Sequence, residues 1–284
     1  MAHYKYQIFI PGGNKTALVL GLDGLENDIV RRKEIQDKIM AERRGDRDGE
    51  VEQVGFISLE KPYHLVMTGG EFCGNAMRAA VAYYLNGRKG EIELTVSGAS
   101  KPLSAGISVM GETWAQMPVF DDLCSSISHV QNGMYWVSIE GISHLIVPQT
   151  LFAAHYSDLF GHRFESPKSM ASRLLKKVAD EHSLDTGNAC GIIFLENVVD
   201  VLKMHPFVYV KEAGTTYYES GCGSGAICVG LVSSSFRKES VSLSLLQPSG
   251  KFIRAEVDCS ENGNKIIGKI SGIVEHGNIY EVEV

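Results

Sequence analysis

The chain contains the same strand–turn–helix pattern twice, with a cysteine in each glycine-rich turn. The first copy reads TGGEFCGNAMRAAVAYYL and the second reads YYESGCGSGAICVGLVSSSF. The turn cysteines, Cys73 and Cys222, lie 149 positions apart, and the Ser-Gly pairs that end the following strand in each half lie 152 positions apart. Both offsets are close to half of the 284 residues, so the sequence predicts a duplicated lobe.

Hydrophobic spacing predicts the same elements in both halves. Apolar residues between Asn75 and Leu85 fall at i, i+3, i+4 and i+7, and those around Ile227 and Leu231 keep helical spacing, which indicates a helix after each cysteine. Short β-rich runs bounded by glycine surround both helices. We therefore expect an α+β fold of two similar lobes, with the active site in the cleft where the cysteine turns face each other.

Charge and composition disfavour several classes of function. The formal net charge of -7 provides no basic surface for nucleic acid. No signal-peptide pattern and no run of 18 apolar residues is present, which predicts a cytoplasmic protein with no membrane span. The 6 cysteines show neither CxxC spacing nor a His/Cys cluster with metal-ligand spacing, so we expect free thiols and no metal site.

A cysteine at a helix N-terminus has a defined chemistry. The first N–H groups of a helix have no intrahelical partner and carry partial positive charge, so they lower the pKa of a nearby thiol and can bind a carboxylate. Gly74 and Gly223, beside the thiols, allow a ligand to approach the backbone. One thiolate could remove the α-proton of an amino acid while one thiol returns a proton to the opposite face. Cys73 and Cys222 are therefore predicted to be the acid and base of a cofactor-independent amino acid racemase.

The alternative for any single cysteine is a packing role, because a buried cysteine is most often a small hydrophobic residue. We assign that role to the other four cysteines, which are Cys124, Cys190, Cys228 and Cys259. Cys73 and Cys222 differ from them because they occupy equivalent points of the duplication. A non-catalytic amino-acid-binding protein or a thiol redox protein remains an alternative of a different class.

The two cysteine turns resemble the paired signatures of the diaminopimelate epimerase family. Residues 73–78, CGNAMR, match the family's Cys-Gly-Asn-Gly-x-Arg except at Ala76, and residues 222–225, CGSG, match its Cys-Gly-(Thr/Ser)-Gly. Asn14, in PGGNKT, resembles the asparagine with which the family contacts its substrate. The resemblance implies two pseudo-symmetric lobes, each a β-sheet wrapped around a central helix, and two-cysteine catalysis without a cofactor.

The same resemblance implies how the chain divides between the lobes. The last strand of the family returns to the first lobe. We therefore expect an N-terminal lobe of residues 1–118 and 270–284, which holds the first catalytic cysteine. Residues 119–269 would form the C-terminal lobe, which holds the second.

Departures from the family pattern disfavour diaminopimelate as the substrate. Ala213 and Gly214 stand where the family has the Glu-Arg pair that recognises the distal end of diaminopimelate. Ile142 and His64 stand where it has asparagines. A site without these groups cannot hydrogen-bond a distal carboxylate in the same way.

The chain is similar instead to the histidine racemases of staphylopine-type metallophore biosynthesis. The similarity lies in residues 51–57, 64–75, 219–225 and 247–250, with Gly221 as one departure. It implies conversion of L-histidine to D-histidine without pyridoxal phosphate, and it implies that Glu52 and Glu219 lie at the site. One carboxylate could orient the imidazole, and the other could bind the ammonium or raise the pKa of a thiol. A racemase for another amino acid, of the diaminopimelate or proline type, remains an alternative.

Other residues near the motifs complete the predicted substrate site. Asn75 and Ser224 are expected to support binding of the substrate carboxylate, largely through their backbone N–H groups, although either side chain could instead cap its helix. His64 is also assigned to the site, with a packed core histidine as the alternative. The predicted partner is a small amino acid, and the chain could act as a monomer or a homodimer.

Overall fold

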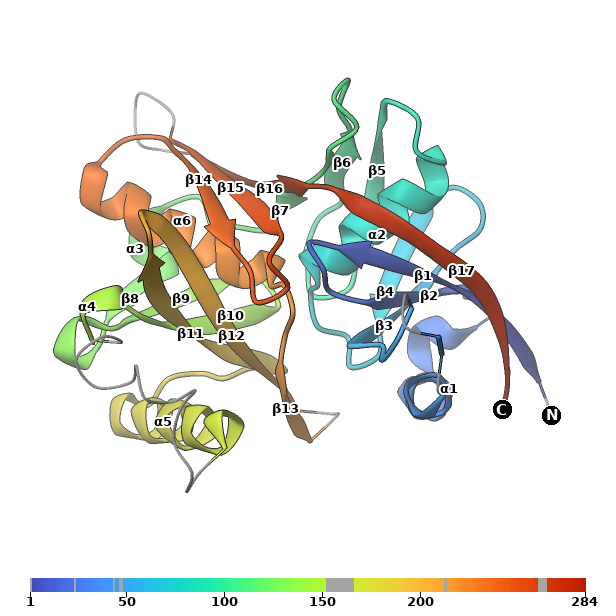
Figure 1. Cartoon of the computed structure of the whole chain (residues 1–284), viewed down its shortest axis with the longest axis horizontal. Helices are drawn as coiled ribbons and strands as arrows, with labels where there is room; N and C mark the ends of the chain where they lie inside the picture. The colour runs from blue at the N-terminus through green and yellow to red at the C-terminus, as the bar shows by residue number, and fades with distance from the viewer. Residues whose placement is uncertain are drawn as a thin grey trace.

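The computed structural model describes residues 2–22, 24–42, 44–45, 48–151, 166–211, 214–259 and 265–284, so that Ala213 lies outside the described residues. Figure 1 shows two lobes side by side, with both termini at the outer end of the first lobe. Each lobe combines strands with a long central helix. The expected α+β fold of two similar lobes is confirmed.

The first lobe contains the N-terminal strands and the last strand of the chain. Its strands are β1 (His3–Pro11), β2 (Thr16–Leu20), β3 (Gln53–Ile57), β4 (Tyr63–Met67), β5 (Gly90–Val96), β6 (Leu103–Ile107), β7 (Thr113–Met117) and β17 (Val274–Glu283). Its helices are η1 (Leu25–Asn27), α1 (Ile29–Ala41) and α2 (Gly74–Leu85).

The second lobe repeats this arrangement around another helix. Its strands are β8 (Ile127–His129), β9 (Tyr135–Ile139), β10 (Ile142–Val147), β11 (Ala189–Val198), β12 (Val201–Val210), β13 (Thr215–Tyr218), β14 (Val241–Leu246), β15 (Phe252–Cys259) and β16 (Ile266–Gly272). Its helices are α3 (Leu123–Ser126), η2 (Gln131–Gly133), α4 (Gln149–Leu151), α5 (Pro167–His182) and α6 (Gly223–Arg237).

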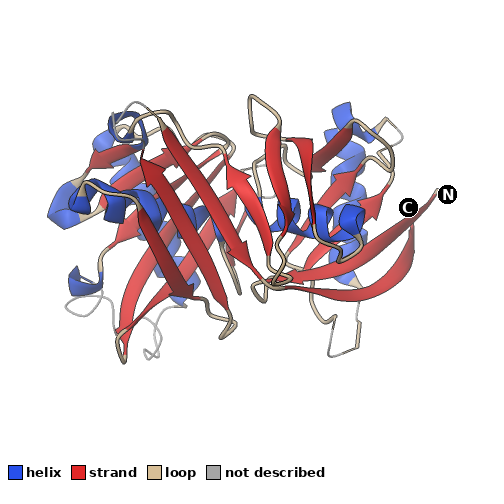
Figure 2. Cartoon of the chain, turned by 90° about the horizontal axis from the view of Figure 1, so that it is seen from above, coloured by secondary structure: helices blue, strands red, loops and turns tan. Residues whose placement is uncertain are grey.

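Helices α2 and α6 are the central helices of their lobes. All residues of 74–82 in α2 and of 223–231 in α6 are buried, whereas α1 buries only one face, at Arg32, Ile35, Gln36 and Ile39. A helix that is buried all round needs apolar or small residues at every position, which the runs of Ala, Val, Gly and Met supply. Figure 2 shows strands on either side of these helices. The cysteine-bearing start of each helix therefore lies in the protein interior.

The sheets of the two lobes are joined along one edge. Strand β16 pairs antiparallel with β15 of the second lobe and with β7 of the first lobe. Strand β17 then crosses to the first lobe, where it pairs antiparallel with β1. The proposed lobe boundary between residues 269 and 270 falls within β16, a strand that belongs to both sheets by its hydrogen bonds.

Candidate active site

Cys73 and Cys222 occupy the same local position in the two lobes. Each is the N-cap of its central helix in extended backbone conformation, with φ and ψ of -138° and 109° at Cys73 and -126° and 106° at Cys222. The Cys73 sulfur accepts from the Ala76 N–H at 3.4 Å, and the Cys222 sulfur accepts from the Gly225 N–H at 3.3 Å. A short polar side chain at the N-cap is the usual partner of these N–H groups, and here the thiol takes that place.

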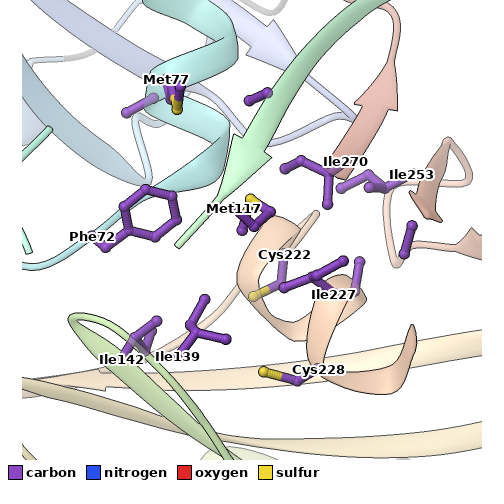
Figure 3. Close-up of a cluster of buried hydrophobic side chains, with 14 of the residues drawn as sticks. Phe72, Met77, Met117, Ile139, Ile142, Cys222, Ile227, Cys228, Ile253 and Ile270 are labelled. Carbon is purple, nitrogen blue, oxygen red and sulfur yellow. The ribbon is translucent and has the colours of Figure 1, made fainter. Parts of the chain in front are cut away.

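The two helix starts lie against each other across the lobe interface. A Cβ atom on Gly223 would lie 3.3 Å from Asn75 Oδ1 and 3.7 Å from the Asn75 backbone nitrogen. A Cβ atom on Gly74 or on Gly223 would meet Ile270 Cδ1, at 2.8 Å and 2.6 Å. Figure 3 shows Met117 and Ile270 between α2 and Cys222 at the start of α6. A side chain at either position would displace the end of Ile270, and at Gly223 it would also press on Asn75, so glycine at residue 223 favours the close approach of the two turns.

One cavity is lined by both cysteines. Its wall includes the turn residues Cys73, Gly74, Asn75, Cys222, Gly223 and Ser224, and its volume is about 30 Å³. A second cavity of about 130 Å³ adjoins it and shares Gln53, Glu71 and Glu219 with it. We refer to these as the thiol cavity and the outer cavity. The predicted cleft between the cysteine turns is present.

Both lobes enclose Cys73 in this structure, which we call the closed form, and burial keeps the side chain a thiol. Its S–H donates to Gln53 Oε1 at 3.0 Å. The pKa of Cys73 is raised to about 12, with burial as the largest cause; helix N–H groups act to lower it, and the charges of Glu219 and Glu71 act with burial to raise it. The sequence-based expectation of a lowered thiol pKa is wrong for this closed form, because desolvation of the thiolate outweighs the helix N-terminus.

Arg78 is a fully buried cation that interacts electrostatically with Cys73. Its Nη2 donates to Asn75 Oδ1 at 2.9 Å, and Asn75 Nδ2 donates in turn to the Gly221 carbonyl at 2.7 Å. Burial lowers the pKa of Arg78 to about 10, so the guanidinium remains charged at neutral pH, and its charge is attracted to the Cys73 thiolate. Asn75 therefore links the first cysteine turn to the second through its side chain, and Arg78 orients that side chain.

Cys222 lies in a more enclosed setting than Cys73. Its backbone N–H donates to Oε1 of the buried Gln247 at 3.0 Å, and its sulfur lies 3.5 Å from Ser224 Oγ. Burial, followed by the charge and the hydrogen bond of Glu219, raises the pKa of Cys222 well above its ordinary value. Burial and the nearby carboxylates Glu52 and Glu71 raise the pKa of Glu219 itself to about 8. Glu219 thus faces the second thiol, and ionisation of this carboxyl group opposes ionisation of the thiol.

Glu52 bonds to both lobes. Its Oε2 accepts from Asn14 Nδ2 at 3.1 Å and from the Ser220 backbone N–H at 2.8 Å, and its Oε1 accepts from the Lys15 N–H at 3.4 Å. Burial is the main cause that raises the pKa of Glu52. Asn14 is fully buried and accepts from Gln53, so it supports Glu52 and Gln53 and does not line either cavity.

The structure places His64 away from the two cysteines. His64 lies on β4, its backbone N–H donates to Ser58 Oγ, and it lines neither the thiol cavity nor the outer cavity. His144, which the sequence reasoning passed over, is fully buried with Nε2 2.9 Å from Ser224 Oγ. Burial lowers its pKa to about 3, so His144 is neutral.

Glu71, Gln53 and Gln247 are the other polar residues of the site that the sequence reasoning missed. Glu71 stands two residues before Cys73, and Gln53 stands next to Glu52. Both therefore lie within the segments of family similarity, residues 64–75 and 51–57. Gln247 begins the quoted QPSG segment. The sequence did contain a signal for these residues. Each is an amide or carboxyl side chain in a motif segment that leads into a buried turn, where polar side chains are uncommon unless they have a role.

All 6 cysteines are free thiols. No cluster of three or more His, Cys, Asp or Glu side chains suited to a metal ion occurs among the residues that the structure describes. Within the same residues, no helix combines the length and the apolar character needed to span a membrane.

Comparisons with known proteins place this chain in a family. Residues 4–280 match the family described as histidine racemase CntK N-terminal domain. A histidine racemase of Fusobacterium nucleatum subsp. nucleatum is 30% identical over 282 residues, which cover 95% of this chain and 94% of that protein.

Two solved structures share the fold at low sequence identity. A phenazine biosynthesis protein of the PhzF family from Bacillus anthracis is 16% identical, with a TM-score of 0.64 over 100% of both chains. A probable proline racemase from Agrobacterium radiobacter is 13% identical, with a TM-score of 0.64 over 99% of this chain and 93% of that chain. The chain belongs to the CntK-type histidine racemase family, because the family model matches nearly the whole sequence and a cysteine caps the N-terminus of each central helix.

Proposed function

We propose that the protein is a cofactor-independent histidine racemase that interconverts L-histidine and D-histidine. The family match and the histidine racemase relative support the substrate, and the two facing thiols support the reaction. The single observation that carries the mechanism is that Cys73 and Cys222 line one cavity from two different lobes.

The helix starts would hold the substrate carboxylate. The amides of Gly74, Asn75, Gly223 and Ser224 belong to the first turns of α2 and α6, where backbone N–H groups lack intrahelical acceptors. A carboxylate held there places the α-carbon near the two N-cap sulfurs. As the α-proton leaves, negative charge develops on the carboxylate, and the same N–H groups and helix dipoles stabilise it.

One thiolate would remove the α-proton, and the opposite thiol would donate a proton to the other face of the carbon. Reversal of these roles converts the D-enantiomer back to the L-enantiomer. The substrate ammonium would bring positive charge next to Glu52, Glu71 and Glu219, which oppose thiolate formation in the closed form. Binding of the substrate would therefore lower the pKa of the thiols when a thiolate is needed.

Deuterium exchange tests this proposal. Purified protein without added pyridoxal phosphate should place deuterium at the α-carbon of L-histidine in D2O and generate D-histidine, as seen by NMR and chiral chromatography. C73S and C222S should each lose racemisation by at least about 1,000-fold, because each lacks one acid/base group. C124S, which changes an exposed cysteine outside both cavities, is the matched control and should retain full activity.

The alternatives give different results in the same experiment. A racemase for another amino acid would exchange the α-proton of that compound and leave histidine unlabelled. A binding protein would bind histidine with unchanged affinity in C73S and C222S and would exchange nothing.

We further propose that the protein acts in the cytoplasm as a monomer or a homodimer. The free thiols support a reducing compartment. Both catalytic cysteines come from one chain, so either oligomeric state leaves the site complete. Light scattering of the purified protein measures which state is present.

A further inference from the structure

Glu71 is a buried carboxylate at the junction of the two cavities. It lines both the thiol cavity and the outer cavity, and it stands two residues before Cys73. Its Oε2 is buried and has no hydrogen-bond partner among the described residues. Burial raises the pKa of Glu71, against the effect of backbone N–H groups at Gly69 and at Glu71 itself. A buried carboxylate oxygen without a partner is costly, and such groups concentrate at functional sites.

Arg32, the cation that interacts electrostatically with Glu71, donates its hydrogen bonds to other groups. Arg32 attracts Glu71 electrostatically, but its guanidinium donates to the backbone carbonyls of Thr68, Leu25 and Glu26. Arg32 therefore fixes the turn that leads to Glu71 without bonding to the carboxylate. The open Oε2 needs a donor that the described residues do not supply.

The composition of the outer cavity indicates what donor would suit it. Glu52, Glu71 and Glu219 all line this cavity, while Lys33 is its only basic lining residue among those described. Val208 and Val210 add apolar walls. A flat ring that carries N–H groups, and that can accept a positive charge, matches a cavity with apolar walls and an excess of carboxylates.

We propose that Glu71 accepts a hydrogen bond from the substrate's imidazole N–H in the outer cavity and thereby selects histidine against side chains that lack this donor. The inference rests on the proposed function, and it adds a specificity residue to it. With the carboxylate at the helix starts and the α-carbon between the thiols, the side chain leaves the thiol cavity through the opening that Glu71 borders. Removal of the acceptor would leave the imidazole N–H unpaired in a buried site, which is how such sites reject wrong substrates.

The test compares histidine with 3-(2-thienyl)alanine, an amino acid of similar shape whose ring has no N–H. Binding constants for both are measured by calorimetry, or by competition, in the wild-type protein and in E71M and E71Q. In the wild-type protein, histidine should bind at least about 100-fold more tightly than the thienyl compound. E71M should reduce this ratio to below about 10 by weakening histidine alone, and E71Q, which keeps an acceptor without the charge, should fall between the two.

Controls separate the possible outcomes. E196Q removes a carboxylate that bonds to His205 and lines neither cavity, so it should leave the ratio unchanged. Equal weakening of both compounds in E71M would assign Glu71 to the α-ammonium and overturn the proposal, as would an unchanged ratio. If E71M fails to fold by circular dichroism, E71Q alone decides: a ratio equal to that of the wild-type protein sinks the idea.

These measurements do not depend on turnover. Failure of wild-type protein to exchange the α-proton of histidine would overturn the proposed racemase function. The ratio of binding constants would still test whether Glu71 selects histidine over the thienyl compound. The two failures are therefore distinguishable.

Discussion

The two cysteine turns have nearly the same backbone geometry but different chemical surroundings. Both thiols cap a buried helix and accept from the N–H three residues later. Cys73 donates to the neutral amide of Gln53 and lies near the Arg78 cation, whereas Cys222 faces the Glu219 carboxylate and is only 2% exposed. The duplication thus preserved the position of each thiol, while residues from elsewhere in the chain set how easily each one ionises.

The difference gives the two thiols distinct resting states. Glu219 raises the pKa of both thiols, but it acts on Cys222 through a hydrogen bond as well as through its charge, and the Arg78 cation interacts favourably with the Cys73 thiolate. We therefore expect Cys73 to ionise first in the free enzyme, with Cys222 as the proton donor.

The largest expected effect is that the two cysteine variants differ in which enantiomer of histidine they still deuterate. C73S and C222S should each lose racemisation by at least about 1,000-fold yet keep slow α-deuterium exchange with one enantiomer only, and the favoured enantiomer should be opposite in the two variants. The remaining thiol faces one side of the α-carbon, so it can remove and return a proton only on that side. NMR of separate L- and D-histidine samples in D2O measures this. The same preferred enantiomer in both variants would contradict a site with one thiol on each face.

A second prediction concerns the contact between the helix starts. G223A should reduce kcat/KM by about 10- to 100-fold, because the new Cβ would lie 2.6 Å from Ile270 Cδ1 and force the turns apart. I270V removes the Cδ1 atom, so G223A/I270V should recover part of the activity. I270V alone is the control and should lose less than about threefold. Failure of the double variant to recover would show that the approach of the turns does not depend on this contact.

A third prediction tests whether Cys73 ionises more readily than Cys222. Iodoacetamide should modify Cys73 before Cys222, and R78M should slow modification of Cys73 by about tenfold at pH 8 while it leaves Cys222 unchanged. Removal of the cation raises the pKa of Cys73, and the thiolate is the reactive form. Peptide mass spectrometry over time provides the rates. Faster labelling of Cys222 in the wild-type protein would reverse the assigned resting states.

The smallest effect concerns stability and pH. The pKa of Glu219 rises from 4.5 to about 8 on folding, so its contribution to stability is complete below pH 4.5 and is lost as the pH rises to about 8. E219Q cannot ionise and should therefore lose fewer degrees of Tm than the wild-type protein between pH 5 and pH 9, by about 5–10 °C. Differential scanning calorimetry at several pH values measures the two slopes. Parallel curves would mean that Glu219 is not the group that titrates.

Features that depend on local spacing or on the internal repeat could be predicted from sequence, whereas individual long-range contacts could not. The helix after each cysteine and the N-cap position of each thiol depend on residues within one turn, so spacing alone predicted them. The bond from Glu52 to Ser220 joins residues 168 positions apart, and no local pattern encodes it. The same limit explains why Glu71 was missed and why His64 was assigned to a site that it does not border.

The pKa of each thiol also depends on one cause that is local in sequence and one that is not. The helix N-terminus, which the sequence reveals, does lower the pKa of both cysteines. Burial by both lobes, which appears only when Phe72, Ile142, Ile270 and the carboxylates are assembled in space, acts in the other direction and is larger.

The shared edge between β7 and β16 has a mechanical consequence. Because the hydrogen bonds of that edge hold the two sheets together, we expect any separation of the lobes to occur as a rotation about it. The thiol cavity of about 30 Å³ is smaller than an amino acid, so we expect such a rotation to accompany substrate binding. Such a rotation would separate Glu52 from Ser220 and Asn75 from Gly221, so we expect these inter-lobe hydrogen bonds to align the two cysteine turns when the lobes come together.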